Sequence, residues 1–214
     1  MDTTMISLFI CIAIPTILVL FFLEKKAKLT VLFVVIGMFV CVYISGINGL
    51  ILSNLNNDVF YVTTTITPIT EEIAKALPIL FFAYVFSNKR EDLITVSFAL
   101  GAGFAVMENV YLVFTNGSID IIWALIRAFG AGLMHSLCTA NVGYGMALIK
   151  DRKKLAFCGM FALLTVAIIF HATYNLLVQS DLEILGFLLP IFAYIPLLTM
   201  IIVKKVKAKK TAAI

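Results

Sequence analysis

The sequence has few charged residues for its length. Asp, Glu, Lys and Arg make up 13% of the 214 residues, whereas 62% of the residues are hydrophobic. A soluble domain of this size could not bury so much apolar surface, so the shortage of charge excludes a soluble protein. We therefore expect an all-α integral membrane protein in which residues 1–214 form a single domain.

Cysteine and histidine are also scarce. The four cysteines lie within apolar runs and no CxxC pair occurs, which excludes a disulfide framework and predicts packed free thiols. The sequence contains no HExxH, the zinc-binding motif of many metalloproteases. Only two histidines are present, His135 and His171, and both fall inside apolar runs.

Seven apolar runs follow one another, and each is close to or above the ~20 residues that span a bilayer. They cover roughly residues 5–23, 30–52, 60–86, 93–114, 119–149, 155–178 and 182–203. Lys and Arg gather in the loops after the first, third and fifth runs and in the C-terminal tail, while the other loops have none. The positive-inside rule then predicts about seven transmembrane helices, with the N-terminus outside and the C-terminus cytoplasmic. We expect the basic tail to anchor this topology against anionic lipid, and we expect no nucleic-acid partner.

A few ionisable residues fall inside these runs. They are Glu71, Glu72, Lys75, Glu108, Arg127, His135 and His171. A charge at membrane depth costs several kcal/mol, roughly 2.5 to 3.5 on insertion scales, and such residues usually mark function. Counted from the outer ends of their runs, they would share one level in the outer half of the bilayer. We expect a polar site inside a four-helix catalytic core over residues 60–178.

The centre of this site is the segment that contains Glu71, Glu72 and Lys75. On a helix, Lys75 can reach either carboxylate, because it lies four residues after Glu71 and three after Glu72. One carboxylate then has a counter-ion, and the other is free to hold and activate a water. The alternative is a buried ion pair that only fixes helix packing.

Local signals predict how the helices around the site begin and pack. Thr67 followed by Pro68 is typical of a helix N-cap, so the third spanning helix is expected to begin there. The fifth apolar run is too long for one crossing of the bilayer. We expect its first part, which ends at Arg127, to lie along the outer interface. The crossing itself is then expected to start near Phe129. Small residues in the fourth and fifth runs would let the helices approach closely. They are Ala99, Gly101, Gly103 and Ala105, and Ala128, Gly130, Ala131 and Gly132.

Three further side chains have more than one possible role. Asn175 shares a helix face with His171 and could orient that imidazole or a bound water. Arg127 could neutralise Glu108 or an oxyanion, or anchor its helix at the interface. Cys138, one turn from His135, is expected to pack and not to act as a ligand.

An ordered set of motifs runs through residues 60–178. It consists of Glu71-Glu72-x-x-Lys75, Gly103-Phe104-Ala105-x-x-Glu108-Asn109, Arg127 leading to His135-Ser136-Leu137-x-Thr139, Gly143-Tyr144-Gly145 and His171-x-x-x-Asn175. This set resembles the PrsW family of intramembrane proteases, which is related to the type II CAAX prenyl proteases and the bacteriocin-processing proteases. Lys75 stands where the CAAX branch carries arginine, which favours the PrsW branch and argues against a prenylated substrate.

The resemblance implies both a site and a setting. The implied catalytic residues are Glu71, Glu72, Glu108, His135, His171 and Asn175, supported by Lys75, Asn109 and Arg127. The implied setting is the plasma membrane of a prokaryote. There a multi-pass protease of this family cuts a membrane protein or peptide, such as a single-pass anti-sigma factor, on its extracytoplasmic side.

Two mechanisms and a second class of function are open at this point. Glu71 or Glu72 could act as general base on a water, with the histidines and Asn175 stabilising the oxyanion. Alternatively, Glu108, His135 and His171 could ligate a divalent metal such as Zn²⁺. Intramembrane Glu, His and Arg also occur in proton- or ion-coupled transporters and in binding proteins. A transporter is disfavoured because the acids cluster at one level and the sequence shows no inverted repeat.

Overall fold

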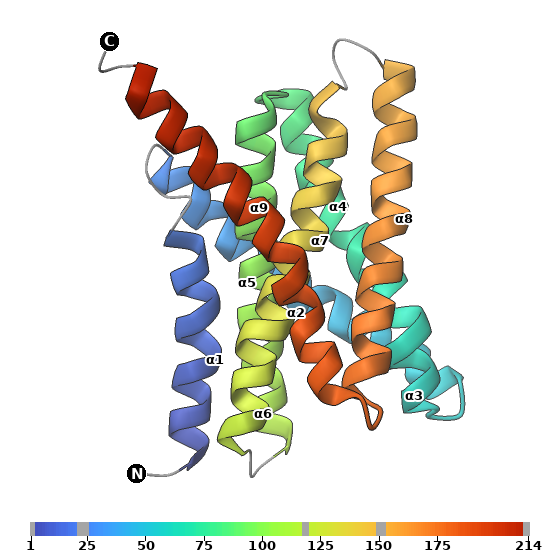
Figure 1. Cartoon of the computed structure of the whole chain (residues 1–214). Coiled ribbons are helices and arrows are strands. Elements are labelled where there is room, and N and C mark those ends of the chain that lie inside the picture. The colour runs from blue at the N-terminus through green and yellow to red at the C-terminus, as the bar shows by residue number, and fades with distance from the viewer. Residues whose placement is uncertain (1–2, 21–25, 117–119, 149–152, 212–214) are drawn as a thin grey trace.

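The computed structural model describes residues 3–20, 26–116, 120–148 and 153–211, and within these ranges the secondary structure is entirely helical. The helices pack side by side into a bundle (Figure 1). They are α1 (Thr3–Leu20), α2 (Ala27–Asn54), α3 (Val59–Tyr61), α4 (Thr67–Val85), α5 (Arg90–Asn116), α6 (Ile121–Leu125), α7 (Gly132–Gly145), α8 (Lys153–Val178) and α9 (Glu183–Thr211). Two π-helical segments, Val62–Ile66 and Ile126–Ala131, and a 3₁₀ turn, Met146–Leu148, join some of them. The expected all-α class is confirmed.

Among the described residues, five helical stretches are long and apolar enough to cross a membrane. They are α1, α2, Arg90–Thr115 of α5, Ile121–Gly145 through α6 and α7, and Phe157–Val178 of α8. The chain is therefore a multi-pass membrane protein. Two of the seven expected spans do not meet the same criterion: α4 carries three charged residues, and the apolar part of α9, Glu183–Pro196, is short.

Helix α4 is polar on its inner face and apolar on its outer face. Glu71, Glu72 and Lys75 are buried. An exposed apolar stripe runs along the opposite face of α4. Its residues are spaced four apart and are Ile73, Leu77 and Phe81. A helix that keeps its charges inside the protein and its apolar side chains outside suits a lipid environment.

Helix α5 lies between α2 and α7, and its glycines bring the three backbones together. A Cβ on Gly101 would lie 2.4 Å from the carbonyl oxygen of His135 on α7, and one on Gly103 would lie 2.0 Å from that of Val34 on α2. No side chain fits at either position. The small residues therefore allow close helix contact as expected, and the Gly101 contact lies beside His135.

The start of α4 differs from the expectation. Thr67 is the first residue of α4, but Ile66 before it is already helical and no side chain caps the helix. The helical backbone instead begins at α3, where the Asp58 carboxylate accepts a hydrogen bond from the Tyr61 amide at 2.9 Å. The Thr63 and Thr64 hydroxyls each donate to a carbonyl four residues back, at 2.8 and 2.6 Å. This back-bonding keeps polar β-branched residues inside a helix, which is why the predicted N-cap at Thr67 is wrong.

The fifth run also differs. Helical backbone continues from Ile121 to Gly145 through the π segment Ile126–Ala131, with no break near Phe129. Arg127 lies inside this continuous helix, where its guanidinium bonds Glu108. The predicted interfacial segment ending at Arg127 is therefore corrected to one helical passage with a π insertion.

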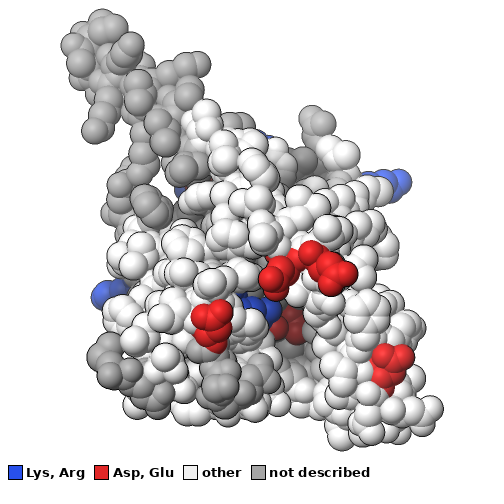
Figure 2. Space-filling view, turned by 60° about the horizontal axis from the view of Figure 1, so that its bottom comes forward, with Lys and Arg blue, Asp and Glu red and all other residues white. Residues whose placement is uncertain are grey.

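The two ends of the bundle differ in their charged residues. Helix α1 begins at one end and α9 finishes at the other, as an odd number of crossings requires (Figure 1). Exposed Asp58, Asp120, Asp181 and Glu183 lie in the turns that have no Lys or Arg, and Figure 2 shows acidic side chains on the end where α1 begins. The basic loop residues Lys25, Lys150 and Arg152 lie outside the described residues. The sidedness of the membrane stays a prediction.

Candidate active site

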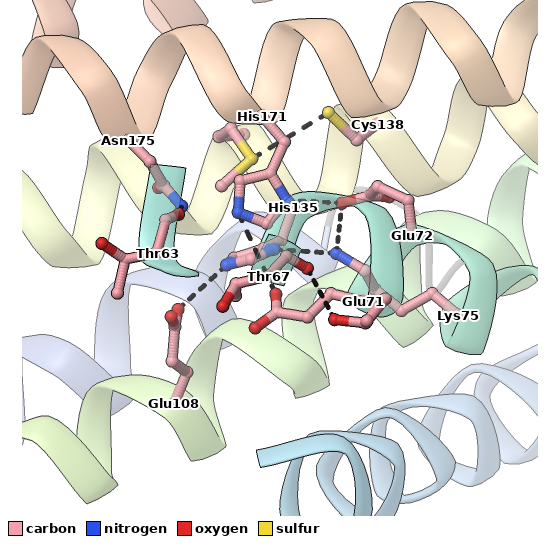
Figure 3. A network of polar contacts seen from close by, with 12 residues as sticks. Thr63, Thr67, Glu71, Glu72, Lys75, Glu108, His135, Cys138, His171 and Asn175 are labelled. Atoms are coloured by element: carbon pink, nitrogen blue, oxygen red, sulfur yellow. Dashed lines mark hydrogen bonds and ion pairs between the residues drawn. The ribbon is translucent and has the colours of Figure 1, made fainter. Parts of the chain in front are cut away.

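Four helices contribute the ionisable side chains of one buried cluster (Figure 3). Helix α4 supplies Glu71, Glu72 and Lys75, α7 supplies His135, and α8 supplies His171. All five residues are at most 3% exposed. Glu108 of α5 completes the cluster. The structure thus brings together six of the residues that the sequence predicted for the site.

Lys75 is the counter-ion of Glu72. Its ammonium donates to Glu72 Oε1 at 2.6 Å and to His135 Nδ1 at 2.9 Å. It also lies 4.5 Å from the centroid of the Phe104 ring, a cation–π contact that suits a buried ammonium. The expectation that Lys75 reaches one of the two carboxylates is confirmed, and the partner is Glu72.

His171 is oriented by the same carboxylate oxygen. Its Nδ1 lies 2.8 Å from Glu72 Oε1, and because a carboxylate accepts, Nδ1 carries the hydrogen and donates. Nε2 is then the nitrogen with a free lone pair. It faces Glu71 Oε2 at 3.9 Å.

The orientation of His135 follows from its two partners. A lysine ammonium can only donate, so Nδ1 accepts and Nε2 carries the hydrogen. Nε2 donates to Glu108 Oε2 at 2.9 Å. Glu108 is held in turn by Arg127, at 2.6 Å from its terminal nitrogen, and Arg127 Nε donates to Asn109 Oδ1 at 3.2 Å. Of the alternatives for Arg127, the structure shows the pairing with Glu108.

Glu71, His135 and His171 form a set that could hold a metal ion. One ligand atom from each lies within 4.8 Å of the others, and Glu71 Oε2 is buried with no hydrogen-bond partner among the described residues. Two imidazoles and a carboxylate with an open fourth position are the donor set of a hydrolytic zinc site. Each imidazole also has its other nitrogen on a carboxylate, as metal-ligating histidines usually do. The residues therefore fit a divalent metal.

The carboxylate of this set differs from the one expected from the sequence. Glu108 was the predicted ligand, but it accepts hydrogen bonds from His135 and Arg127, and Glu71 is the carboxylate that joins the two histidines. The side chain of Glu108 is 22% exposed, whereas that of Glu71 is 5% exposed. Glu108 thus orients His135 from the outer edge of the site.

Asn175 is bonded elsewhere in the structure. Its amide donates to the carbonyl of Thr63 at 2.9 Å and, within the described ranges, makes no hydrogen bond to His171. It therefore ties α8 to the π segment that precedes α4. Cys138 packs as expected, with its thiol donating to the Ala167 carbonyl at 3.5 Å.

Two residues of the site had no assigned role in the sequence. Phe104 contacts Lys75 and stacks at a tilt on His135, with ring centroids 5.0 Å apart. Phe104 lies four residues before Glu108, and that spacing was the signal that it shares the inward face of α5. Thr63 is the second; its backbone carbonyl carries no signal in the sequence.

The bundle is hollowed on its acidic end, and the site is partly exposed at one edge. Figure 2 shows a hollow on that end in which acidic and basic side chains are visible. The side chains of Glu108 and Arg127 are 22% and 12% exposed, whereas those of Lys75 and Glu72 are fully buried. Glu108 and Arg127 are therefore the more accessible members of the site, and the histidines lie deeper.

A multi-pass helical bundle with a buried Glu/His/His set is consistent with a membrane-embedded, metal-dependent hydrolase. Residues 25–202 match the family described as PrsW family intramembrane metalloprotease, and the chain belongs to that family. The resemblance seen in its motifs is confirmed. No curated protein and no solved structure matches the chain.

Proposed function

We propose that the protein is an endopeptidase that hydrolyses a peptide bond of a membrane-associated protein, with residues 60–178 as its catalytic core. The observation that carries this proposal is the convergence of Glu71, His135 and His171. Both imidazoles are oriented by carboxylates, and Glu71 Oε2 has no other partner in the described structure.

Glu71 Oε2, His135 and His171 Nε2 would hold the metal ion. A bound zinc ion would supply a Lewis acid for the scissile carbonyl and would lower the pKa of a water molecule. The protein must then provide a base, a proton for the leaving amine and a dry cavity.

Glu72 is placed to move the proton. Its Oε1 accepts from Lys75 and His171, which fixes the carboxylate, while its Oε2 is buried without a partner among the described atoms. Oε2 would take a proton from the attacking water and pass it to the leaving amine. Glu72 follows Glu71 directly in the sequence, so one turn of α4 supplies both a ligand and a base.

The substrate is proposed to be a single-pass membrane protein, such as an anti-sigma factor, in the plasma membrane of a prokaryote. The family membership and the hollow on the acidic end support cleavage on the extracytoplasmic side. This requires the predicted topology, with the N-terminus outside.

Elemental analysis of purified protein tests the donor set. Wild type should carry about one zinc ion per chain, and Glu71→Gln and His171→Ala should each lose most of it. Glu183→Gln, at an exposed glutamate on the same end, is the matched control and should retain the metal. Wild-type protein that cleaves its substrate with no bound metal would instead favour glutamate chemistry alone.

A further inference from the structure

The ammonium of Lys75 lies against Nδ1 of His135, the ring nitrogen that has a lone pair to offer a metal. His135 Nε2 donates to Glu108, whose carboxylate is held by Arg127. Nδ1 is therefore the nitrogen with a lone pair, and Lys75 Nζ lies 2.9 Å from it. A metal–imidazole bond of about 2.0–2.1 Å uses the same lone pair.

The other two donor atoms have no such occupant. His171 Nε2 faces Glu71 Oε2 at 3.9 Å, and its Nδ1 is occupied by Glu72. Glu71 Oε2 has no hydrogen-bond partner among the described residues. Two of the three donor atoms are therefore free to bind a metal ion, and the third accepts a hydrogen bond from Lys75.

We propose that Lys75 competes with the metal ion for His135 Nδ1 and withdraws from this nitrogen when the site is loaded. The inference rests on the proposed donor set of Glu71, His135 and His171. It gives Lys75 a second role beside its pairing with Glu72: Lys75 sets how tightly the protein holds its metal.

Lys75 can leave His135 without losing its other partners. Its ammonium also donates to Glu72 Oε1 at 2.6 Å and lies over the Phe104 ring. Lysine has a long flexible stem with three rotatable donors, so a small rotation can free Nδ1 while both of these contacts remain. The charge of Lys75 then stays paired inside the protein.

Nitrogen NMR of wild-type protein labelled with ¹⁵N-histidine tests the exchange directly. The chain has two histidines, so the spectrum reports each ring nitrogen separately. On addition of Zn²⁺, His135 Nδ1 and His171 Nε2 should change from lone-pair to metal-bound signals, while His135 Nε2 and His171 Nδ1 keep their hydrogens. Zinc binding through His135 Nε2, or zinc binding that leaves His135 unchanged, would overturn the inference and leave the protease assignment standing.

Zinc affinity gives an independent test. Lys75→Met removes the competing ammonium at similar length, so the Kd for Zn²⁺ should fall roughly tenfold to a hundredfold. Lys89→Met makes the same change at an exposed lysine and should leave the Kd unchanged. A Kd for Zn²⁺ of Lys75→Met that equals or exceeds the wild-type value would refute the inference. If neither wild type nor Lys75→Met binds zinc, both the proposed donor set and the inference fail. If Lys75→Met does not fold, the NMR spectrum of the wild-type protein tests the inference alone.

Discussion

At the scale of single residues, one carboxylate oxygen organises the site. Glu72 Oε1 accepts from both Lys75 and His171. Lys75 reaches on to His135, and His135 reaches Glu108. Removing any member leaves buried polar groups without partners, which is costly in a low-dielectric interior. These side chains therefore act as a unit.

Glu72→Gln should abolish proteolysis with the fold retained. Glutamine matches glutamate in size but cannot accept a proton from water, so cleavage of a membrane substrate should fall by about a hundredfold or more. His171→Ala should have a similar effect. Helix content and detergent-solution stability are measured beside activity, and a Glu72→Gln protein with near wild-type cleavage would refute the role of Glu72.

Arg127→Lys should separate positioning from metal binding. Arginine bonds Glu108 and Asn109 together through its fork, whereas lysine supplies a single point charge. Arg127 acts on His135 only through Glu108. We therefore expect the cleavage rate to fall about tenfold, as is common when a residue that hydrogen-bonds a metal ligand or its partner is replaced. The zinc content should stay near the wild-type level. Arg127→Lys activity equal to wild type would show that the fork is dispensable.

At the scale of helices, the site depends on close backbone contacts and on two π segments. Gly101 lets α5 approach α7 at the carbonyl of His135. The π segment Val62–Ile66 precedes the helix that carries Glu71 and Glu72, and Asn175 donates to its Thr63 carbonyl. π insertions are frequent at functional sites, and here one of them lies directly before the buried face of α4 that carries Glu71 and Glu72.

Gly101→Ala should lower both stability and activity. A methyl group there would lie 2.4 Å from the His135 carbonyl oxygen, so α7 must shift at a cost of about 1–3 kcal/mol. Gly46→Ala is the matched control, because a Cβ at Gly46 meets nothing within 4 Å. Thermal unfolding in detergent should show a lower Tm for Gly101→Ala alone. Equal Tm values for the two variants would show that this helix contact is loose.

The helices and the cluster could be predicted from the sequence because burial and charge follow simple rules. Apolar runs predicted the long helices, and the spacing of Lys75 from Glu71 and Glu72 predicted an ion pair with one of them, which the structure shows to be Glu72. The π segments could not be predicted, since threonine back-bonding replaced the cap expected at Thr67. Whether Glu71 or Glu108 groups with both histidines as a candidate metal ligand depends on how α4 and α5 are rotated about their axes. Tertiary packing sets that rotation, so the sequence could not predict it.

At the scale of the whole molecule, the bundle has one acidic end, and Figure 2 shows a hollow on that end. Exposed carboxylates lie on this end, and Glu108 and Arg127 are partly exposed whereas the histidines are buried. If the substrate enters through this hollow, as we propose, only one side of the membrane can supply the scissile bond. The predicted topology makes this the extracytoplasmic side.

Reporter fusions test the topology. A reporter placed after Lys210 should read cytoplasmic, and one inserted within residues 54–58 should read outside, because Lys and Arg favour the cytoplasmic side. A reversed result at either position would place the hollow on the cytoplasmic side and contradict extracytoplasmic cleavage.

The central claim is that this site performs metal-dependent proteolysis inside the membrane. Its most direct test is cleavage in proteoliposomes that contain the protein and a single-pass anti-sigma factor from the same genome. We predict that the substrate is cut, that a membrane-permeable zinc chelator stops the reaction, and that added Zn²⁺ restores it in wild type but not in His171→Ala. Cleavage that continues at full rate after the metal has been removed would contradict the account.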